Sequence, residues 1–181
     1  RGQRLELFVS TQTPYMDRDE VAQVLGIAPD QVRIIPSAVG GGFGGKLDCS
    51  VQPLLAVAAW IMEKPIRCTF TRPESLASST KRHPAKMKAS ASCNKDGTLK
   101  SLSFEGDFNT GAYASWGPTV ADRVPIHSSG PYFVPNILAK TRALLTNGPP
   151  SGAFRGFGVP QSAIAHEALM DFLAEQTRID Q

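Results

Sequence analysis

The sequence predicts an α+β fold in which mixed sheets pack against helices. Short β-branched segments are interspersed with helical patterns, and one pair of alternating segments has the form of a β-hairpin. With 181 residues, the chain is long enough to bury a sizeable core. We therefore expect residues 1–181 to form one domain, or a domain divided into two small lobes over 1–82 and 83–181.

The first third of the chain predicts two strands on either side of a helix. Residues 5–9 and 32–35 are rich in β-branched and large apolar side chains, which is typical of strands. Between them, Asp17 and Glu20 have the spacing of a capping box that opens a short helix, and Gly26 follows its end.

The region after residue 47 predicts a buried helix and further short elements. Asp48 or Ser50 is a candidate cap for a helix with Pro53 in its first turn that runs to about residue 63. This helix is apolar on nearly every face, so we expect it to be buried. Residues 66–71 predict a strand and residues 73–79 a helical turn.

The second half of the chain contains the hairpin pattern. Residues 86–93 alternate between polar and apolar, residues 94–97 predict a turn, and the chain returns through an apolar face. Residues 137–145 predict another strand. A last helix begins at Pro160 and has one apolar stripe. The stripe consists of Ile164, Ala165, Ala168, Leu169, Phe172 and Leu173.

Composition narrows the class of protein. The net charge is +3 and the Lys and Arg residues are scattered, which argues against a nucleic-acid-binding surface. No apolar run approaches the roughly 20 residues that span a bilayer. The chain begins at Arg1 without a leader pattern, as expected for an excised or processed segment. We expect a soluble, cytoplasmic protein, with the periplasm as the alternative.

The three cysteines support a reduced setting. Cys49, Cys68 and Cys93 form no CxxC pair, and an odd number cannot pair completely. We expect Cys68 and Cys93 to be buried, because free cysteine behaves as a small hydrophobe. An iron–sulfur cluster needs about four thiolates, so this chain is not expected to house one.

Two glycine loops are the most informative feature. The first is Gly40-Gly41-Gly42-Phe43-Gly44-Gly45-Lys46, and the second is Phe154-Arg155-Gly156-Phe157-Gly158. Glycine permits positive φ and lets the backbone approach a ligand closely. Each loop combines bare main chain with phenylalanine and a cation. The pattern therefore favours a large, anionic cofactor.

Two nucleotide-binding interpretations of the first loop are weaker. Its glycines match the Gly-x-Gly-x-x-Gly motif of dinucleotide-binding proteins. However, no clear helix begins at Gly45, and the acidic residue expected about 20 positions later could only be Glu63, which lies near the end of a predicted helix. The loop also nearly fits a phosphate-binding loop, except that Leu47 stands where Ser or Thr would hold magnesium. A purely structural turn is the third alternative.

Four blocks together carry a family resemblance. The two loops, at 40–46 and 153–161, are joined by Ser10-Thr11-Gln12 and by Asp122-Arg123 with the segment 131–136. In this order and spacing they resemble the molybdenum hydroxylases, the xanthine dehydrogenase and aldehyde oxidase family. The resemblance covers essentially the whole chain and places it in the molybdopterin-binding large subunit or domain.

The resemblance implies roles for particular residues. It places Gln12, Phe43 and Arg155 near the molybdenum without binding it directly, and it makes the backbone of Gly42, Phe43 and Gly44, with Arg155, part of the cofactor site. Gln12 and Arg123 are the catalytic candidates. Arg123 would stabilise charge on a substrate, Phe157 would pack on the substrate ring, and Leu47 would be a further substrate-binding residue. The alternatives are a solvent-facing glutamine and a surface arginine on a helix.

Two departures from the family pattern bear on the substrate. Xanthine-specific members carry glutamate where Leu47 stands, so the resemblance favours an aldehyde or a less polar N-heterocycle over xanthine. The carbon monoxide dehydrogenase branch carries a copper-binding cysteine where Gly156 stands, which argues against that branch.

The reaction implied by the resemblance is hydroxylation with water as the oxygen source. It requires the molybdenum–molybdopterin cofactor, the rest of the molybdopterin domain, and iron–sulfur and FAD domains or subunits. The family's glutamate base lies beyond Gln181, so we expect this segment alone to be inactive and to hold no cofactor stably. The alternative is a non-catalytic homologue or scaffold fragment that binds partner subunits.

Other catalytic patterns are sparse. Ser78 and Lys81 match a short acyl-transfer motif whose companion motifs are missing. His83, His127 and His166 show no metal-ligand spacing.

Overall fold

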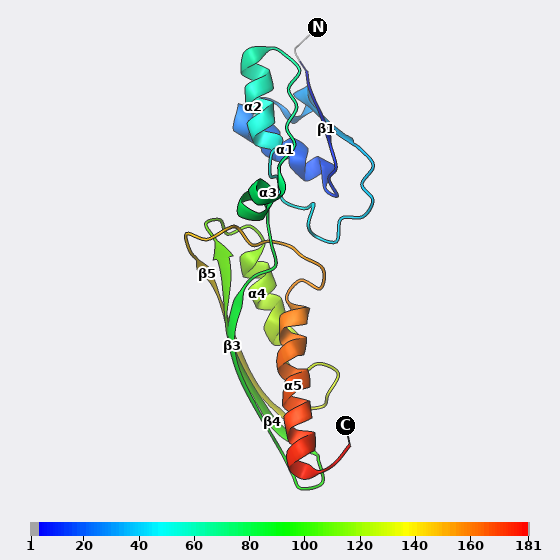
Figure 1. Ribbon diagram of the computed structural model, residues 1–181, viewed down its shortest axis with the longest axis vertical. Helices are drawn as coiled ribbons and strands as arrows, with labels where there is room; N and C mark the ends of the chain where they lie inside the picture. Colours follow the sequence, from blue (N-terminus) through cyan, green and yellow to red (C-terminus); the bar gives the residue numbers. More distant parts are fainter. Residues whose placement is uncertain (1–3, 181) are drawn as a thin grey trace. The chain divides into compact units, whose positions relative to one another are not determined.

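A computed structural model describes residues 4–180 (Figure 1). The chain divides into two compact units. The first contains residues up to Lys81 together with Ala153–Arg155, and the second contains Arg82–Gly152 and the residues from Gly156 onward. Helices and two sheets, one parallel and one mixed, make up the fold, so the predicted α+β class is confirmed.

The first unit is built on two parallel strands and the helix that connects them. β1 (Leu5–Val9) and β2 (Val32–Pro36) form a two-stranded sheet in the register Leu5 to Val32. α1 (Pro14–Leu25) and the 3₁₀ helix η1 (Pro29–Gln31) connect them. Helix α1 ends at Gly26 in the left-handed conformation, as predicted. It begins three residues before Asp17, which is buried inside the helix rather than capping it, so the predicted capping box is wrong.

Two further helices complete this unit. α2 (Gln52–Met62) and α3 (Arg72–Ser78) follow the first glycine loop. No side chain caps α2. Instead, Oε1 of Gln52 accepts the backbone N–H groups of Ser50 and Val51, so the predicted Asp48 or Ser50 cap is wrong. The helix is buried on one face only, because Leu54, Ile61 and Met62 are exposed. The prediction of burial on nearly every face is therefore also wrong.

The core of the first unit lies between the sheet and helices α1 and α2. Leu5, Leu7 and Val32 of the strands pack against Val21 and Ala22 of α1, and Ala56 of α2 joins them. A buried polar contact also ties the two helices together, since Nε2 of Gln52 donates to Oδ2 of Asp17 at 3.2 Å. The predicted strand over 66–71 is wrong, because these residues have no strand partner.

The second unit is a three-stranded sheet with two helices on one face (Figure 1). β3 (Ala85–Cys93) and β4 (Leu99–Gly111) form the predicted antiparallel hairpin. β5 (Asn136–Leu145) pairs with β4 in parallel, after a crossover through α4 (Gly117–Ile126). The bounds of α4 did not follow from the sequence pattern. The final helix, α5 (Val159–Thr177), packs against β3 and α4.

The core of the second unit lies under these two helices. Leu102, Phe104 and Phe108 of β4 pack with Ala121 and Val124 of α4. The predicted apolar stripe of α5 is only partly correct. Its Ala165 and Leu169 pack on the core, whereas Ile164 and Phe172 are exposed and the polar residues Ser162 and His166 are buried. The error arises because buried polar partners shift the inward face of the helix.

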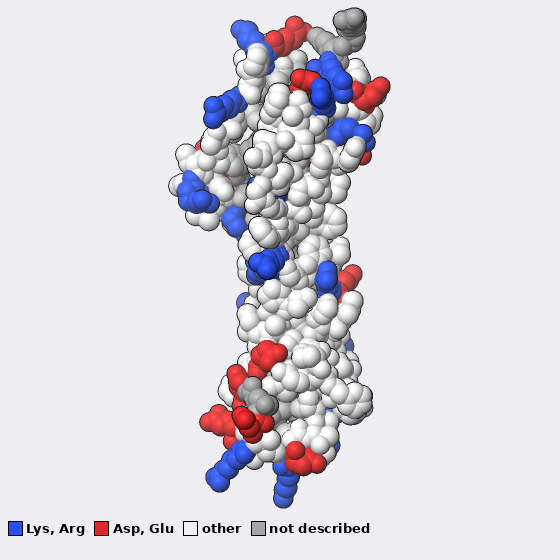
Figure 2. Space-filling view, turned by 90° about the vertical axis from the view of Figure 1, so that its right-hand side faces the viewer, with Lys and Arg blue, Asp and Glu red and all other residues white. Residues whose placement is uncertain are grey.

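The helices and the surface bear on the expectations about membrane spans, charge and cysteines. No helix among residues 4–180 is long and apolar enough to cross a membrane. On the face shown in Figure 2, Lys and Arg groups are separated by uncharged or acidic surface. Cys68 is exposed and Cys93 is half-buried, so the expectation that both are buried is wrong for Cys68.

Candidate functional site

The first glycine loop is fastened to the segment that follows β1. The backbone N–H of Gln12 donates to the carbonyl of Lys46 at 3.1 Å, and the hydroxyl of Thr13 donates to the carbonyl of Leu47 at 3.1 Å. The hydroxyl of Thr11 also lies 3.4 Å from the Lys46 carbonyl. The block at residues 10–12 is therefore held directly against the end of the first loop, although they lie more than 30 positions apart.

Lys46 fastens the loop from within. Its Nζ donates to Oγ of Ser10 at 2.7 Å and also to the carbonyl of Val39. The sequence suggested that this cation presents positive charge to a ligand. Instead, it closes the loop on itself and binds it to the segment after β1. The exposed cation at this site is Arg155 of the second loop.

Gln12 is held by the backbone of the loop. Its Oε1 accepts a hydrogen bond from the backbone N–H of Gly44 at 3.1 Å. Oε1 is therefore engaged as an acceptor, and Nε2 is the donor atom of this side chain. Gly42 gives it room, since a Cβ on Gly42 would lie 2.2 Å from Oε1 and 2.9 Å from Cβ of Gln12.

Both glycine loops contain the same backbone turn. Phe43 and Gly44 have φ of 51° and 85°, and the N–H of Gly45 donates to the carbonyl of Gly42 at 2.9 Å. This is the pattern of a type I′ turn, which requires positive φ at both central residues. The turn geometry explains the glycine at position 44, where φ is positive.

The second loop repeats the turn with Phe157 and Gly158 at its centre. Their φ values are 49° and 97°, and the N–H of Val159 donates to the carbonyl of Gly156 at 3.0 Å. A positive φ is costly for a bulky residue, so two phenylalanines in this conformation mark functional candidates. The repetition of the turn was not predicted.

The first unit brings part of the second loop against the first. A Cβ on Gly44 would lie 3.0 Å from the carbonyl carbon of Ala153 and 3.0 Å from the amide nitrogen of Phe154. The two backbones can approach this closely only because residue 44 is glycine. The guanidinium of Arg155 lies over the ring of Phe43, 5.7 Å from its centroid, which is within cation–π range.

This cluster, which we call the loop junction, consists of Gln12, Gly42, Phe43, Gly44 and Arg155. It offers main-chain amides, one neutral side-chain amide, an exposed aromatic ring and a guanidinium. That set of donors suits an anionic group with several acceptor atoms. Leu47, half-buried, directly follows Lys46 and donates its backbone N–H to the carbonyl of Gly44 at 3.2 Å.

The other two candidates, Arg123 and Phe157, belong to the second unit. Phe157 makes an edge-to-face contact with Trp116, with ring centroids 6.2 Å apart. Trp116 caps α4, and Arg123 lies in the last turn of the same helix, exposed. Trp116 and Arg123 therefore stand at opposite ends of α4. Trp116 was missed because nothing in its sequence surroundings marks it.

The remaining titratable candidates lack catalytic geometry. The hydroxyl of Ser78 donates to the carbonyl of Glu74 at 2.6 Å, and Nζ of Lys81 donates to the carbonyl of Ser75 at 2.7 Å, so the two do not form a nucleophile and base pair. Within residues 4–180, no group of three His, Cys, Asp or Glu residues could hold a metal ion.

Burial raises the pKa of the Cys49 thiol, and Glu20 and Asp17 raise it further.

Comparisons with known proteins place these features in a family. Residues 1–181 match the family model described as "Molybdopterin cofactor-binding domain". The chain is 47% identical to the nicotinate dehydrogenase large molybdopterin subunit of Eubacterium barkeri, over 97% of this chain and 41% of that protein. It is 37% identical to a probable xanthine dehydrogenase subunit of Bacillus subtilis, over 96% of this chain and 23% of that protein.

Solved structures show the same fold. The aldehyde oxidoreductase from Desulfovibrio gigas superimposes with a TM-score of 0.92 at 30% identity, over 98% of this chain and 20% of that one. Quinoline 2-oxidoreductase from Pseudomonas putida 86 superimposes with a TM-score of 0.89 at 28% identity, over 98% of this chain and 23% of that one. The chain thus spans less than half the length of each of these proteins.

Proposed function

The chain belongs to the molybdopterin cofactor-binding domain family, and from this premise we propose that it forms part of the catalytic molybdenum subunit of an oxidoreductase. The reaction would be the hydroxylation of an aldehyde or an N-heterocycle, with water as the source of oxygen. The observation that carries the proposal is the loop junction, where Gln12 is held by Gly44 and the backbones of Gly44 and Ala153–Phe154 meet.

The residues at the junction fit the cofactor that the family implies. Gly40 has little beside it, since a Cβ on Gly40 would meet nothing within 4 Å. Bare main chain of this kind lets a bulky anion approach closely. The backbone of Gly42, Phe43 and Gly44 would hold the molybdenum–molybdopterin group, with Arg155 supplying positive charge.

When bound, this cofactor supplies the two-electron redox chemistry that side chains lack. The chain's own part is to bind and to orient. Nε2 of Gln12 would donate a hydrogen bond to an oxygen of the group without adding charge, and the bond from Gly44 fixes its direction. Donors fixed before the reaction lower its barrier because they need no reorganisation during it.

Three residues are candidates for substrate contact. We propose that Leu47 lines the pocket with an apolar surface, that Phe157 packs on the substrate ring, and that Arg123 stabilises negative charge developing on the substrate. The relatives support this substrate class, since their names include nicotinate dehydrogenase, aldehyde oxidoreductase and quinoline oxidoreductase. Electrons would leave through iron–sulfur and flavin domains or subunits, and the rest of the molybdopterin domain would complete the site.

The test uses the complete protein that carries this chain, matured with its cofactor. We expect close to one molybdenum per protein molecule and turnover of aldehydes or N-heterocycles, with oxygen from ¹⁸O-labelled water appearing in the product. Molybdenum well below this ratio, without turnover, would support the alternative of a non-catalytic scaffold that binds partner subunits.

A further inference from the structure

Strand β1 has an open edge. Within the described part of the chain, β1 pairs with β2 only, so the edge facing away from β2 presents unpaired N–H and C=O groups. Open edges are templates for pairing with another strand, and native proteins protect them or use them. The protection of this edge is slight: no bulge interrupts the pairing of β1, Phe8 near its end is 72% exposed, and the charged Glu6 is paired with Arg33.

A second unpaired segment lies on the far side of a hollow from this edge. Residues 64–70 make no backbone hydrogen bond with any described residue and have no regular structure. Yet Ile66, Cys68 and Phe70 alternate with polar residues, and this pattern is what predicted a strand at 66–71. The segment has the sequence of a strand but lacks a neighbour.

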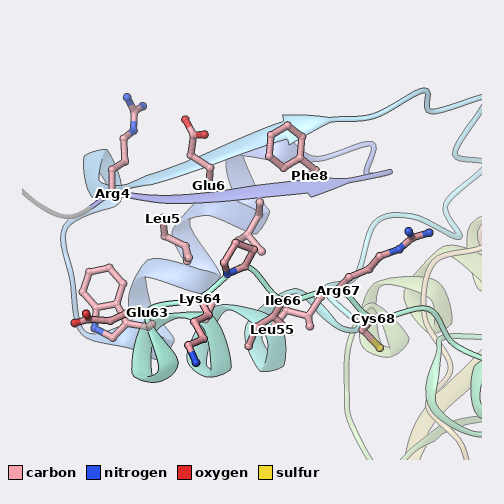
Figure 3. Close-up of a pocket in the computed structure, with 14 residues that line it drawn as sticks. Arg4, Leu5, Glu6, Phe8, Leu55, Glu63, Lys64, Ile66, Arg67 and Cys68 are labelled. Atoms are coloured by element: carbon pink, nitrogen blue, oxygen red, sulfur yellow. The ribbon is translucent and has the colours of Figure 1, made fainter.

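The hollow between them has a volume of about 930 Å³ (Figure 3). Consecutive residues from Arg4 to Phe8 line one side, and consecutive residues from Glu63 to Cys68 line the other. Successive side chains of a strand point to opposite faces, so a hollow lined by every residue follows the backbone edge rather than one face. The apolar residues Leu55, Ala59 and Trp60 of α2 also line it.

We propose that this hollow receives one extended strand from polypeptide outside these 181 residues, paired with β1 on one side and with residues 66–70 on the other. The relatives supply the reason for this choice of occupant, because the chain corresponds to only 41% and 23% of two of them. The proposal concerns assembly of the domain and is independent of the proposed function.

The lining defines the chemistry of the incoming strand. Its side chains toward α2 would be apolar, to cover Leu55 and Trp60, and those on the other face would be polar. The lining carries three cations, Arg4, Lys64 and Arg67, and two carboxylates, Glu63 and Glu6, of which Glu6 is engaged with Arg33 at 3.3 Å. Acidic residues on the polar face of the strand would therefore be favoured. Main-chain hydrogen bonds would supply affinity, as in other cases of strand addition.

Hydrogen exchange on the complete protein tests the proposal. We expect amides of residues 5–9 and 66–70 to exchange at least about 100-fold more slowly than in an unstructured peptide, because both edges are paired. Exchange of residues 66–70 within about threefold of the unstructured rate would overturn the proposal. Protection that rises with protein concentration would also overturn it, because a second copy of the chain would then be the occupant.

A pair of neighbouring proline variants distinguishes strand pairing from simple burial. Adjacent residues in a strand direct their N–H groups to opposite edges, so only one of Arg67→Pro and Cys68→Pro removes a hydrogen bond to the new strand. We expect one variant to lose protection of residues 5–9 by at least about tenfold and the other to retain it. Retention in both variants, or equal loss in both, would contradict strand insertion.

Discussion

The side-chain oxygen of Gln12 lies 3.1 Å from the backbone nitrogen of Gly44 and accepts its hydrogen. This bond joins the segment after β1 to the turn of the first glycine loop, and the same glycine allows the second loop to approach. Three of the four sequence blocks thus meet in the first unit through main-chain contacts.

Replacing Gly42 with alanine should displace the Gln12 side chain. The new Cβ would lie 2.2 Å from Oε1, so the side chain must move and its bond with Gly44 is lost. We expect a loss of about 1–2 kcal/mol in the free energy of unfolding, measured by denaturant titration. Gly45→Ala is the matched control, because its Cβ would meet nothing nearer than 3.6 Å. Equal losses in the two variants would show that crowding against Gln12 is not the cause.

Replacing Gly44 with alanine should separate the two loops. The Cβ would contact the backbone of Ala153 and Phe154 at 3.0 Å, and backbone atoms cannot yield as a flexible side chain does. Gly40→Ala provides the comparison, since Gly40 also has positive φ but open space around it. Both variants incur the conformational cost of about 1 kcal/mol, and Gly44→Ala should lose about 1–3 kcal/mol more. Similar unfolding free energies for the two would refute the close approach.

Cys49 and Cys68 should differ sharply in reactivity. Burial raises the pKa of the Cys49 thiol and the neighbouring Glu20 and Asp17 add to the shift, so the reactive thiolate is scarce at neutral and mildly alkaline pH. Cys68 is exposed on the 181-residue chain. Labelling this chain with a maleimide at about pH 7–9, followed by peptide mass analysis, should modify Cys68 at least about 100-fold faster. Comparable rates would contradict the described environment of Cys49.

Leu47→Glu should change substrate preference in the complete enzyme. A carboxylate at position 47 can accept hydrogen bonds from a hydroxypurine, which leucine cannot. We expect kcat/KM for xanthine to rise at least about tenfold relative to that for an apolar aldehyde. Leu47→Met keeps the apolar surface and should leave this ratio unchanged. If Leu47→Glu also leaves it unchanged, Leu47 does not contact the substrate.

The sequence was most informative where local pattern decides structure. Both strands of the first sheet, the hairpin of the second and the end of α1 at Gly26 followed from periodicity and from glycine's conformational freedom. The start of α1 and the inward face of α5 did not, because Asp17 and His166 are buried polar residues and periodicity assumes that buried residues are apolar.

The site was predictable in its parts but not in its contacts. Glycine and phenylalanine spacing identified both loops, yet no pattern indicates that Lys46 bonds to Ser10 and Val39. The type I′ turns at Phe43 and Phe157 were equally hidden, since positive φ at a bulky residue runs against its intrinsic preference. The failed strand at 66–71 has another cause, because strand sequence alone cannot supply a pairing partner.

Gln12→Glu in the complete, cofactor-loaded protein tests the role of the loop junction most directly. Glutamate retains an oxygen for the Gly44 N–H but replaces the Nε2 donor with a charged acceptor. We predict unchanged molybdenum content and a fall in turnover of at least about 100-fold, the usual cost of losing one preorganised donor. Gln23→Glu on the exposed surface of α1 should have no effect. Turnover of Gln12→Glu within about threefold of the unmodified protein would contradict the account.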